Sequence, residues 1–414
     1  MAEKVLILIE GASNGPFYLE AAKRLNLHPI TLSADPSQYE YLGAKEADII
    51  RIDTSDLKAL IRECAHLRSL YDIAGITSAQ EAVYATVGKL CRYFNLPGPN
   101  PVAVENCCDK FAQRQVLAEA GVPVPAYRLA VNATEVESAA AEIGLPVIVK
   151  PTVGIGSSGV QLCRDVDELV EHTARLMAET DTCRSTPRML VEEYAKGAHY
   201  SVELMGNEVI GIGAADFGRP PHFVCREYIY PAELTENDHR RIVDVARHCL
   251  RALDLGWGPA NIDLRWTERG PVVIEVNPRL AGMPNSRLIH LAYDIDLVAE
   301  HIKLVIGEKL DLLKSNLGIA AAKILVADCD GVLDAIRGDS RAAAITGVIE
   351  AKFFVQPKLT VVRKGDNSDR IGHVIAVSPT LAQTKAIIQR AVELMDWSIT
   401  PSPNGSLPNP QDLK

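Results

Sequence analysis

The sequence predicts a protein of the α/β and α+β classes, with a doubly wound α/β domain first and a small α+β domain last. In residues 1–100, short apolar runs alternate with helical patterns, as expected for a parallel sheet covered by helices. From about residue 317 the pattern changes to short strands and one helix at 380–394. A chain of 414 residues is long enough for two to four domains.

Composition argues against several classes of partner. The chain is 47% apolar and 23% charged, as ordinary globular proteins are, and its net charge of −10 argues against nonspecific nucleic-acid binding. The apolar run at 5–9 is too short for a signal-peptide core or a membrane span. Nine scattered cysteines without a C-x-x-C pair indicate reduced thiols. We therefore expect a cytoplasmic protein that binds small molecules, and neither nucleic acid nor membranes.

The first domain is expected to hold four strands and an early helix, at 4–9, 29–33, 47–52, 73–77 and 17–25. Its glycine loop at 10–16 lacks the G-x-G-x-x-G spacing of a dinucleotide site. Glu81 follows the last of these strands. It is either a ligand-binding acid at the carboxyl edge of the sheet or an acid favoured by a helix N-terminus.

A run rich in proline and glycine at 96–101 predicts a domain boundary. After it we expect one helix at 102–120, which carries Lys110, and a strand at 146–150, which ends at Lys150. The loop 154–159 matches G-x-G-x-x-G, but an alternating strand follows it where a dinucleotide fold needs a helix. We therefore expect a hairpin tip, either a plain mobile hairpin or a flap whose amides cover a polyphosphate.

Two further alternating segments predict a hairpin over residues 261–279, with a three-residue loop formed by Glu268 to Gly270. This register places Asp263 directly opposite Glu275. Asn261 then faces Asn277. Four apolar residues share the other face of the hairpin: Ile262, Leu264, Ile274 and Val276.

The facing carboxylates suggest a metal site. Two acids with Cβ atoms about 5 Å apart repel each other unless something positive lies between them. Because every ligand on this face offers oxygen, the simplest cation is a hard divalent one. A solvated surface hairpin is the alternative, but Asn277 and Arg279 on the same edge favour a metal site at which phosphate is handled.

Several short motifs follow one another in a specific order: Asp109-Lys110, Val149-Lys150-Pro151 with its glycine loop, Val191-Glu192-Glu193-Tyr194, and Asp263 twelve residues before Glu275-Val276-Asn277-Pro278-Arg279. Their order and spacing resemble the ATP-grasp superfamily, within it the carboxylate–amine ligases, and most closely the L-amino-acid ligases that make dipeptides. The resemblance covers residues 1–310 well and the last hundred loosely. It implies an ATP-grasp fold: a pre-ATP-grasp domain at 1–100, two α+β halves gripping the nucleotide at 101–312, a small α+β domain at 313–400 and a flexible tail at 401–414.

The resemblance also implies roles for single residues. Arg279 and Lys150 would be catalytic, with Arg279 steadying an acyl phosphate. The residues implied to bind ATP are Lys110, Lys150, Gly156, Ser157, Ser158, Glu192, Glu193, Ala195 and His199. Those implied to hold Mg²⁺ or Mn²⁺ are Asp263, Glu275 and Asn277. Weaker candidates for substrate binding are Glu81, His222, Arg226, Glu227 and Arg279.

His199 marks a departure from the family pattern. The family often has Gly-x-Glu, whose glutamate takes the ribose hydroxyls, where this chain has Gly197-Ala198-His199. Histidine can also hydrogen-bond a ribose, so ATP stays the expected nucleotide. The alternative is an exposed histidine at a strand edge.

The function implied by the resemblance is that of an ATP-dependent, ADP-forming ligase. It would activate a small carboxylate, such as an amino acid, as an acyl phosphate and join it to an amine, such as a second amino acid. The alternatives are a purine-pathway ligase or a bicarbonate-activating carboxylase on the same scaffold, and a nucleotide-binding protein without turnover. A homodimer is a further expectation from the family.

Overall fold

The computed structural model describes residues 2–11, 14–39, 41–42, 48–181 and 188–401. Most of the tail expected to be flexible, 401–414, lies outside the described residues. The chain divides into two units. One contains Met1–Val124, Lys196–Ile212 and Ala232–Asn316, and the other contains Pro125–Ala195, Gly213–Pro231 and Leu317–Lys414. The domain limits expected at residues 100, 312 and 400 stay predictions.

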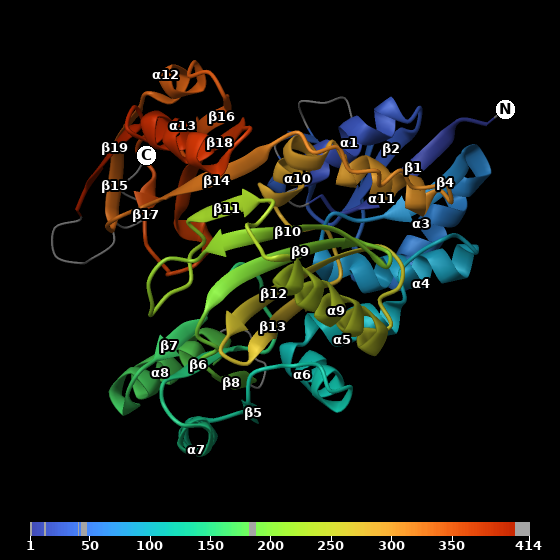
Figure 1. Ribbon diagram of the computed structural model, residues 1–414. Helices are drawn as coiled ribbons and strands as arrows, with labels where there is room; N and C mark the ends of the chain where they lie inside the picture. Colours follow the sequence, from blue (N-terminus) through green and yellow to red (C-terminus); the bar gives the residue numbers. More distant parts are fainter. Residues whose placement is uncertain (1, 12–13, 40, 43–47, 182–187, 402–414) are drawn as a thin grey trace. The chain divides into compact units, whose positions relative to one another are not determined.

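The first unit begins with a parallel sheet in the strand order β3-β2-β1-β4 (Figure 1). Its elements are β1 (Lys4–Ile9), α1 (Gly15–Arg24), β2 (His28–Ser33), a 3-10 turn (Pro36–Gln38), β3 (Asp48–Arg51), α3 (Leu57–Leu70), β4 (Asp72–Thr77), a second 3-10 turn (Glu81–Val83) and α4 (Tyr84–Phe94). Helices α3 and α4 pack on one face of this sheet, and α1 with α11 (Leu297–Val305) on the other. The predicted doubly wound α/β arrangement is confirmed, because helices cover both faces.

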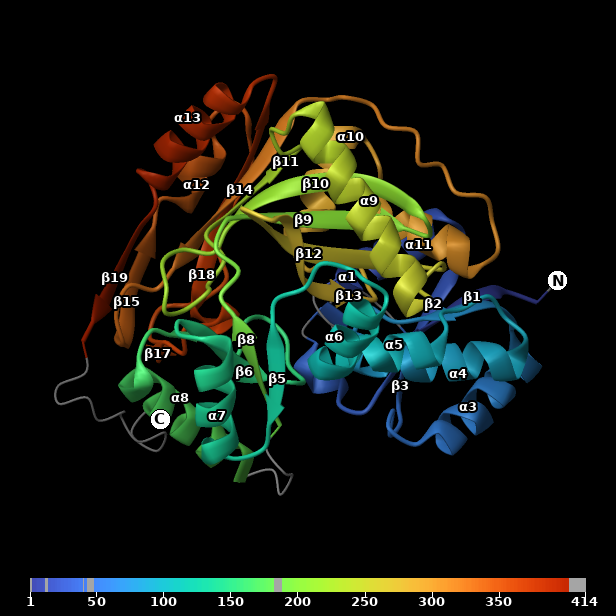
Figure 2. The same cartoon turned by 60° about the horizontal axis from the view of Figure 1, so that its bottom comes forward.

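A second, antiparallel sheet in the first unit carries strands in the order β13-β12-β9-β10. Its elements are β9 (Ala198–Met205), β10 (Glu208–Asp216, which continues into the second unit), α9 (Glu236–Leu253), β12 (Pro259–Thr267) and β13 (Gly270–Asn277), with α5 (Pro101–Cys108), α6 (Lys110–Glu119) and α10 (Asn285–Tyr293) beside them. Helix α9 crosses one face of these strands (Figure 2). Its residues Ile242 and Ala246 join a core there with Ile262 and Leu264. The opposite face is left for polar side chains.

The β12–β13 hairpin reaches the predicted register by a different route. Thr267 pairs with Gly270, so the loop has two residues, and the expected three-residue loop is wrong. Gly270 has φ +97°, a conformation that suits glycine. A bulge at Ile274 then restores the predicted pairing of Asp263 with Glu275. Val273 takes the core position expected for Ile274, which is only partly buried.

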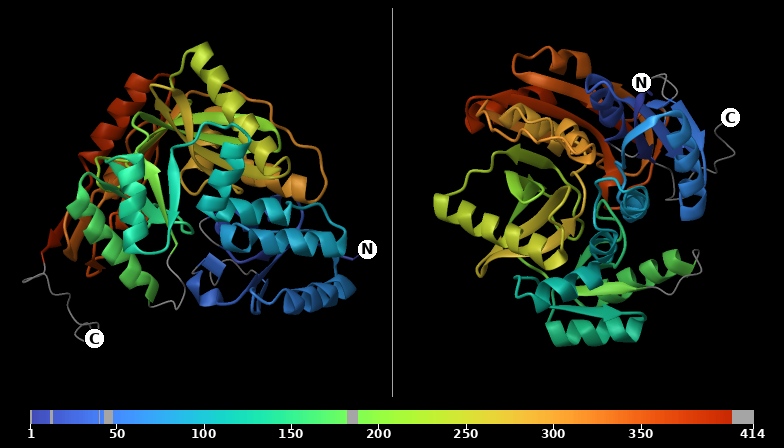
Figure 3. Two further views of the ribbon diagram at one scale, coloured as in Figure 1. Left: turned by 90° about the horizontal axis from the view of Figure 1, so that it is seen from below. Right: turned by 90° about the vertical axis from the view of Figure 1, so that its right-hand side faces the viewer.

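The second unit begins with an antiparallel sheet in the order β5-β8-β6-β7. Its elements are β5 (Tyr127–Ala130), α7 (Ala133–Ile143), β6 (Val147–Pro151), β7 (Gln161–Cys163), α8 (Val166–Asp181) and β8 (Met189–Glu193). Helices α7 and α8 lie together on one face of this sheet (Figure 3). They cover a core that contains Val147, Val149 and Val191. Because side chains alternate along a strand, Lys150 and Glu192 belong to the opposite face.

The rest of the second unit forms the strand order β10-β11-β14-β18-β16 and a small sheet β17-β15-β19. The elements are β11 (Glu227–Tyr230), β14 (Ile319–Val326), β15 (Gly331–Arg337), α12 (Asp339–Ala343), β16 (Val348–Phe353), β17 (Thr360–Val361), a 3-10 turn (Asn367–Asp369), β18 (Arg370–Ser378), α13 (Leu381–Val392) and β19 (Asp396–Thr400). The α+β character predicted for this part is confirmed. The strands expected there from the sequence, at 320–327, 347–355, 359–363 and 373–377, correspond to β14, β16, β17 and β18, whereas β15, β19 and α12 were not expected.

Two observations bear on the expected environment. Every cysteine in the described ranges carries a free thiol. Within the same ranges, the helices are all too short or too polar to cross a membrane.

Candidate active site

Helix α6 places the first site residue, Lys110. The single helix expected at 102–120 is wrong, because Asp109 leaves the helical conformation and divides it into α5 and α6. The Asp109 carboxylate accepts hydrogen bonds from the backbone N–H groups of Phe111 (2.9 Å) and Ala112 (3.0 Å). Asp109 thus caps α6, and Lys110 is the first residue of that helix.

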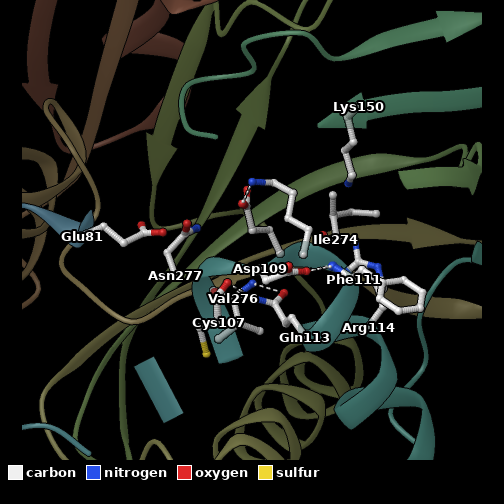
Figure 4. A network of polar contacts seen from close by, with 12 residues as sticks. Glu81, Cys107, Asp109, Phe111, Gln113, Arg114, Lys150, Ile274, Val276 and Asn277 are labelled. Carbon is white, nitrogen blue, oxygen red and sulfur yellow. Dashed lines mark hydrogen bonds and ion pairs between the residues drawn. The ribbon is translucent and has the colours of Figure 1, made fainter. Parts of the chain in front are cut away.

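One turn further along, α6 is attached to the outer edge of β13 (Figure 4). The Gln113 amide pairs with both backbone groups of Val276, donating to its carbonyl (2.7 Å) and accepting from its N–H (2.9 Å). Arg114 donates to the carbonyl of Ile274, the bulged residue. Both side chains are fully buried, so they hold the helix and the bulge in a fixed relation. As a result Lys110 Nζ lies 2.8 Å from Glu275 Oε1.

A polar face runs across β9, β12 and β13, on the side away from α9. Opposed pairs set its rows: Asp263 with Glu275 and Ser201, Asn261 with Asn277 and Glu203, and Arg265 with His199. A lysine ammonium group relieves the repulsion expected between the two facing carboxylates, and a histidine lies beside the other acid. Lys110 contacts Glu275, and His199 Nε2 lies 3.3 Å from Asp263 Oδ1. His199 is 8% exposed, so the alternative of an exposed strand-edge histidine is wrong.

Asn277 belongs to a chain of buried amides. Its Nδ2 donates to Asn261 Oδ1 (3.2 Å), and Asn261 Nδ2 donates to Glu203 Oε1 (3.0 Å) and Ser201 Oγ (2.8 Å). Asn285 Nδ2 also donates to Glu203 Oε1 (3.4 Å). Burial raises the pKa of Glu203 to about 7, because desolvation outweighs the hydrogen bonds that favour its ionised form.

Arg279 and Glu81 form the next part of this site. Arg279 Nε lies 2.7 Å from Glu81 Oε2, and its Nη2 lies 3.5 Å from Asn277 Oδ1. Glu81 is the first residue of a 3-10 turn after β4, so it occupies the helix-start position named as one alternative. The ion pair nevertheless connects Glu81, through Arg279, to Asn277, one of the residues expected to bind metal. The structure therefore brings together Glu81, Lys110, His199, Asp263, Glu275, Asn277 and Arg279.

The oxygen donors of this edge fit a hard divalent cation. Mg²⁺ is commonly held by one or two carboxylates together with substrate phosphates, and an amide oxygen is a further suitable ligand. Among the described residues, no group of three or more His, Cys, Asp or Glu side chains is placed to hold a metal by itself. Asp263, Glu275 and Asn277 would therefore share the ion with phosphate and water.

The second unit holds the other predicted ATP-binding residues. Lys150 Nζ lies 2.5 Å from Glu192 Oε2, and the side chains are 5% and 2% exposed. Ile148 is directly opposite Glu192 in the β6–β8 ladder, so this ion pair runs diagonally between the strands. At the end of β8, the backbone N–H of Glu193 donates to the carbonyl of Ala126 (2.8 Å). The backbone N–H of Ala126 donates in turn to Glu193 Oε2 (3.1 Å). Ala195, two residues beyond, is buried.

The glycine loop 154–159 joins β6 to β7, which confirms the expected hairpin. Its base is held by His172, whose Nε2 contacts the carbonyls of Val149 (3.1 Å) and Gly159 (3.0 Å). Burial lowers the pKa of His172 to about 4. At the tip, Asn367 N–H donates to the Gly156 carbonyl (2.9 Å). Ser158 is exposed and Ser157 is partly exposed.

Three weaker candidates lie elsewhere in the second unit. His222 is partly buried against Gly365, where an added Cβ would come within 2.4 Å of the imidazole ring. Glu227 Oε1 lies 3.9 Å from Lys323 Nζ, and Arg226 is exposed. A role for these residues in substrate binding stays a prediction.

Sequence reasoning missed the residues that support the ligands. Gln113 and Arg114 looked like ordinary polar helix positions, yet they are buried against β13. Glu203 had a readable signal, because polar residues at 199, 201 and 203 alternate with apolar ones in β9. Asn367 had none, since its contact with Gly156 joins distant parts of the sequence.

Comparison with known protein families gives two matches. A family described as an ATP-grasp domain matches residues 143–286. A family described as L-amino acid ligase C-terminal domain 2 matches residues 323–400.

Individual proteins are similar to this chain over most of its length. The chain is 57% identical over 399 residues to the uncharacterized protein y4rH of Sinorhizobium fredii, covering 96% of this chain and 84% of that one. Carnosine synthase 1 of Mus musculus is 26% identical over 333 residues, which cover 74% of this chain but 40% of the synthase.

Solved structures share the fold. The L-amino acid ligase from Bacillus licheniformis has a TM-score of 0.82 at 20% identity, covering 97% of this chain and 100% of that one. The phosphoribosylglycinamide synthetase from Anaerococcus prevotii has a TM-score of 0.70 at 19% identity, covering 96% and 100%.

Proposed function

Because the chain belongs to the ATP-grasp superfamily of ATP- and Mg²⁺-dependent carbon–nitrogen ligases, we propose that it joins two amino acids. One carboxylate is activated as an acyl phosphate, and the amine of the second amino acid displaces phosphate, so that ADP and phosphate are released. The observation that carries this proposal is the oxygen-lined edge at Asp263, Glu275 and Asn277, with Lys110 and Arg279 beside it. Such an edge can hold a metal-bound polyphosphate and an anionic substrate together.

The residues of this edge have separable tasks. Asp263, Glu275 and Asn277 would hold Mg²⁺ or Mn²⁺, which when bound neutralises phosphate oxygens. Lys110 contacts Glu275 in the present structure and would turn its ammonium group to phosphate. The planar guanidinium of Arg279 can donate in pairs to a carboxylate or a transferred phosphoryl group. Glu81, already paired with Arg279, is suited to an amino group of the substrate.

The second unit supplies the residues proposed to bind the rest of ATP, as the resemblance implies. Lys150 would bind phosphate, and Gly156, Ser157 and Ser158 would cover it with backbone amides and hydroxyls. Glu192 and the backbone from Glu193 to Ala195 would meet the adenine edge. His199, on the first unit, would bond the ribose, and its buried contact with Asp263 would then tie nucleotide and metal binding together.

Two alternatives on the same scaffold stay open to test. One is a purine-pathway ligase, because a phosphoribosylglycinamide synthetase shares the fold. A bicarbonate-activating carboxylase is the other. Each of these functions requires a different second substrate. ATP-dependent phosphate release that needs pairs of amino acids would support the proposal, and release that needs a ribonucleotide or bicarbonate would support one of the alternatives.

The direct test separates the two half-reactions. With one amino acid, MgATP and hydroxylamine, the wild type should form an acyl hydroxamate. Glu275→Gln should form none, because the lost charge weakens metal binding before any acyl phosphate forms. Arg279→Ala should bind MgATP within a few-fold of wild type and lose turnover by on the order of a hundredfold, as when one preorganised oxyanion donor is removed.

Matched controls lie in the turn of the same hairpin. Glu268 and Arg269 are exposed there. Glu268→Gln and Arg269→Ala should leave hydroxamate formation unchanged. Hydroxamate and dipeptide formed by Arg279→Ala at the wild-type rate would contradict the assignment of the arginine, and hydroxamate formed by Glu275→Gln would contradict the metal site.

Three broader features are also proposed. The functional domains are residues 1–100, 101–312 and 313–400, which limited proteolysis would test. The protein is cytoplasmic and works as a homodimer, which localisation in cells and light scattering at several protein concentrations would test.

A further inference from the structure

Glu203 is a buried acid on the polar face that none of the proposed catalytic steps uses. It is 1% exposed and lies on β9, directly opposite Asn261. Burying a carboxylate is costly unless it is well hydrogen-bonded. A role in holding neighbouring groups would explain why this strand carries an acid between Val202 and Leu204, two core residues.

The described hydrogen-bond partners of Glu203 are donors. Asn261 Nδ2 lies 3.0 Å and Asn285 Nδ2 lies 3.4 Å from Glu203 Oε1. An ionised carboxylate only accepts hydrogen bonds, whereas an asparagine amide can present either its oxygen or its NH₂ group. In its ionised form, Glu203 therefore requires Asn261 to turn its NH₂ group inward, toward Glu203 and Ser201.

The orientation of the Asn261 amide determines the orientation of the Asn277 amide. With its NH₂ group turned inward, Asn261 presents Oδ1 to Asn277, and Asn277 Nδ2 donates to it at 3.2 Å. The oxygen of Asn277 must then point to the other side, where Arg279 Nη2 lies 3.5 Å away. A metal ion binds the amide oxygen and is repelled by the NH₂ group, so the direction of this amide decides whether Asn277 is a ligand.

We infer that Glu203 is a positioning residue, which through Asn261 turns the Asn277 oxygen toward the metal; the inference rests on the proposed function, because it takes Asn277 as a ligand. Residues behind the metal ligands commonly contribute about 10–100-fold to metal affinity. Without Glu203, the two amides could reverse together and present an NH₂ group to the ion.

A charge swap tests the direction of this chain of hydrogen bonds. In Glu203→Gln the introduced amide can present either group, so metal affinity should fall by about 10-fold or more. In Asn261→Asp two buried carboxylates face each other, and binding should fall further. In Glu203→Gln/Asn261→Asp the introduced amide donates to the introduced carboxylate, which still accepts from Asn277. The double variant should therefore recover affinity beyond either single variant.

The measurement is Mn²⁺ binding followed by electron paramagnetic resonance, in the presence of a non-hydrolysable ATP analogue. It is made at a pH well above 7, so that Glu203 is ionised, and thermal unfolding checks each fold. Glu208→Gln is the matched control, because Glu208 is an exposed acid on the neighbouring strand. Its Mn²⁺ affinity should equal that of the wild type.

The outcomes distinguish failure of this inference from failure of the proposed metal site. Wild-type affinity in Glu203→Gln, or a double variant whose loss is the sum of the two single losses, would overturn the inference alone. Absence of nucleotide-dependent Mn²⁺ binding in the wild type would refute the proposed metal site, and the inference with it. Even if Asn261→Asp fails to fold, the comparison of Glu203→Gln with the double variant decides the question.

Discussion

The buried ion pair of Lys150 and Glu192 predicts that either single substitution is more damaging than both together. Their charged atoms are 2.5 Å apart, and almost none of either side chain reaches solvent. Removing one partner takes the opposite charge away from a buried charge, which costs about 3–5 kcal/mol. Lys150→Met and Glu192→Leu should each destabilise the β6–β8 part of the second unit by this amount.

The double variant Lys150→Met/Glu192→Leu should be less destabilised than either single one. It replaces the pair with apolar side chains on a face that already carries Ile148 and Leu190. Well-packed apolar replacements of buried ion pairs are often neutral or stabilising. Attraction between the two charges is thus offset by the loss of their hydration. The destabilisation by a single substitution therefore measures the cost of burying the remaining charge without its partner in this pair.

Hydrogen exchange at the amides of β6 and β8 is the assay, because it reports local stability in a chain whose two units need not unfold together. Glu142→Gln is the control, since the Arg128–Glu142 pair in the same unit is about half exposed and should contribute little to stability. Single substitutions at Lys150 or Glu192 that cost as little as this control would refute the reasoning and show that water reaches the pair.

Three further predictions concern acid, metal and nucleotide. Burial lowers the pKa of His172 from 6.5 to about 4, so the unfolded chain binds a proton at a higher pH than the folded chain does. The free energy of unfolding therefore falls as the pH drops from 6.5 to 4, by up to about 3 kcal/mol. In His172→Gln this fall should be absent from unfolding experiments made near pH 6.5 and near pH 4. MgATP should raise the thermal midpoint well beyond ATP with EDTA, since only the native state offers the metal site; equal shifts would exclude the ion. Cleavage by a protease within 154–159 should slow in MgATP, and cleavage that ignores the nucleotide would contradict a phosphate flap.

The sequence by itself determined the elements whose patterns are local. Alternation with a period of two predicted which side chains of the hairpin share a face, because successive side chains of a strand point to opposite faces. The pairing of Asp263 with Glu275 was predicted correctly, but it also depends on the bulge at Ile274. The strand pattern after the glycine loop excluded a dinucleotide fold, and a hairpin was found there. The order of the short motifs was sufficient to identify the ATP-grasp family.

Only the tertiary structure decided how the ligands are held. Asp109 is compatible with a continuous helix until its carboxylate caps α6. The bulge at Ile274 depends on Arg114, which is 160 residues away in the sequence. The amide orientation at Asn277 depends on Glu203 from another strand. These contacts join residues far apart in the chain, and their energies come from burial and hydrogen bonding that exist only once the strands and helices have packed. No local pattern encodes these contacts, because the sequence alone does not show whether a glutamine or glutamate is buried or exposed in the folded chain.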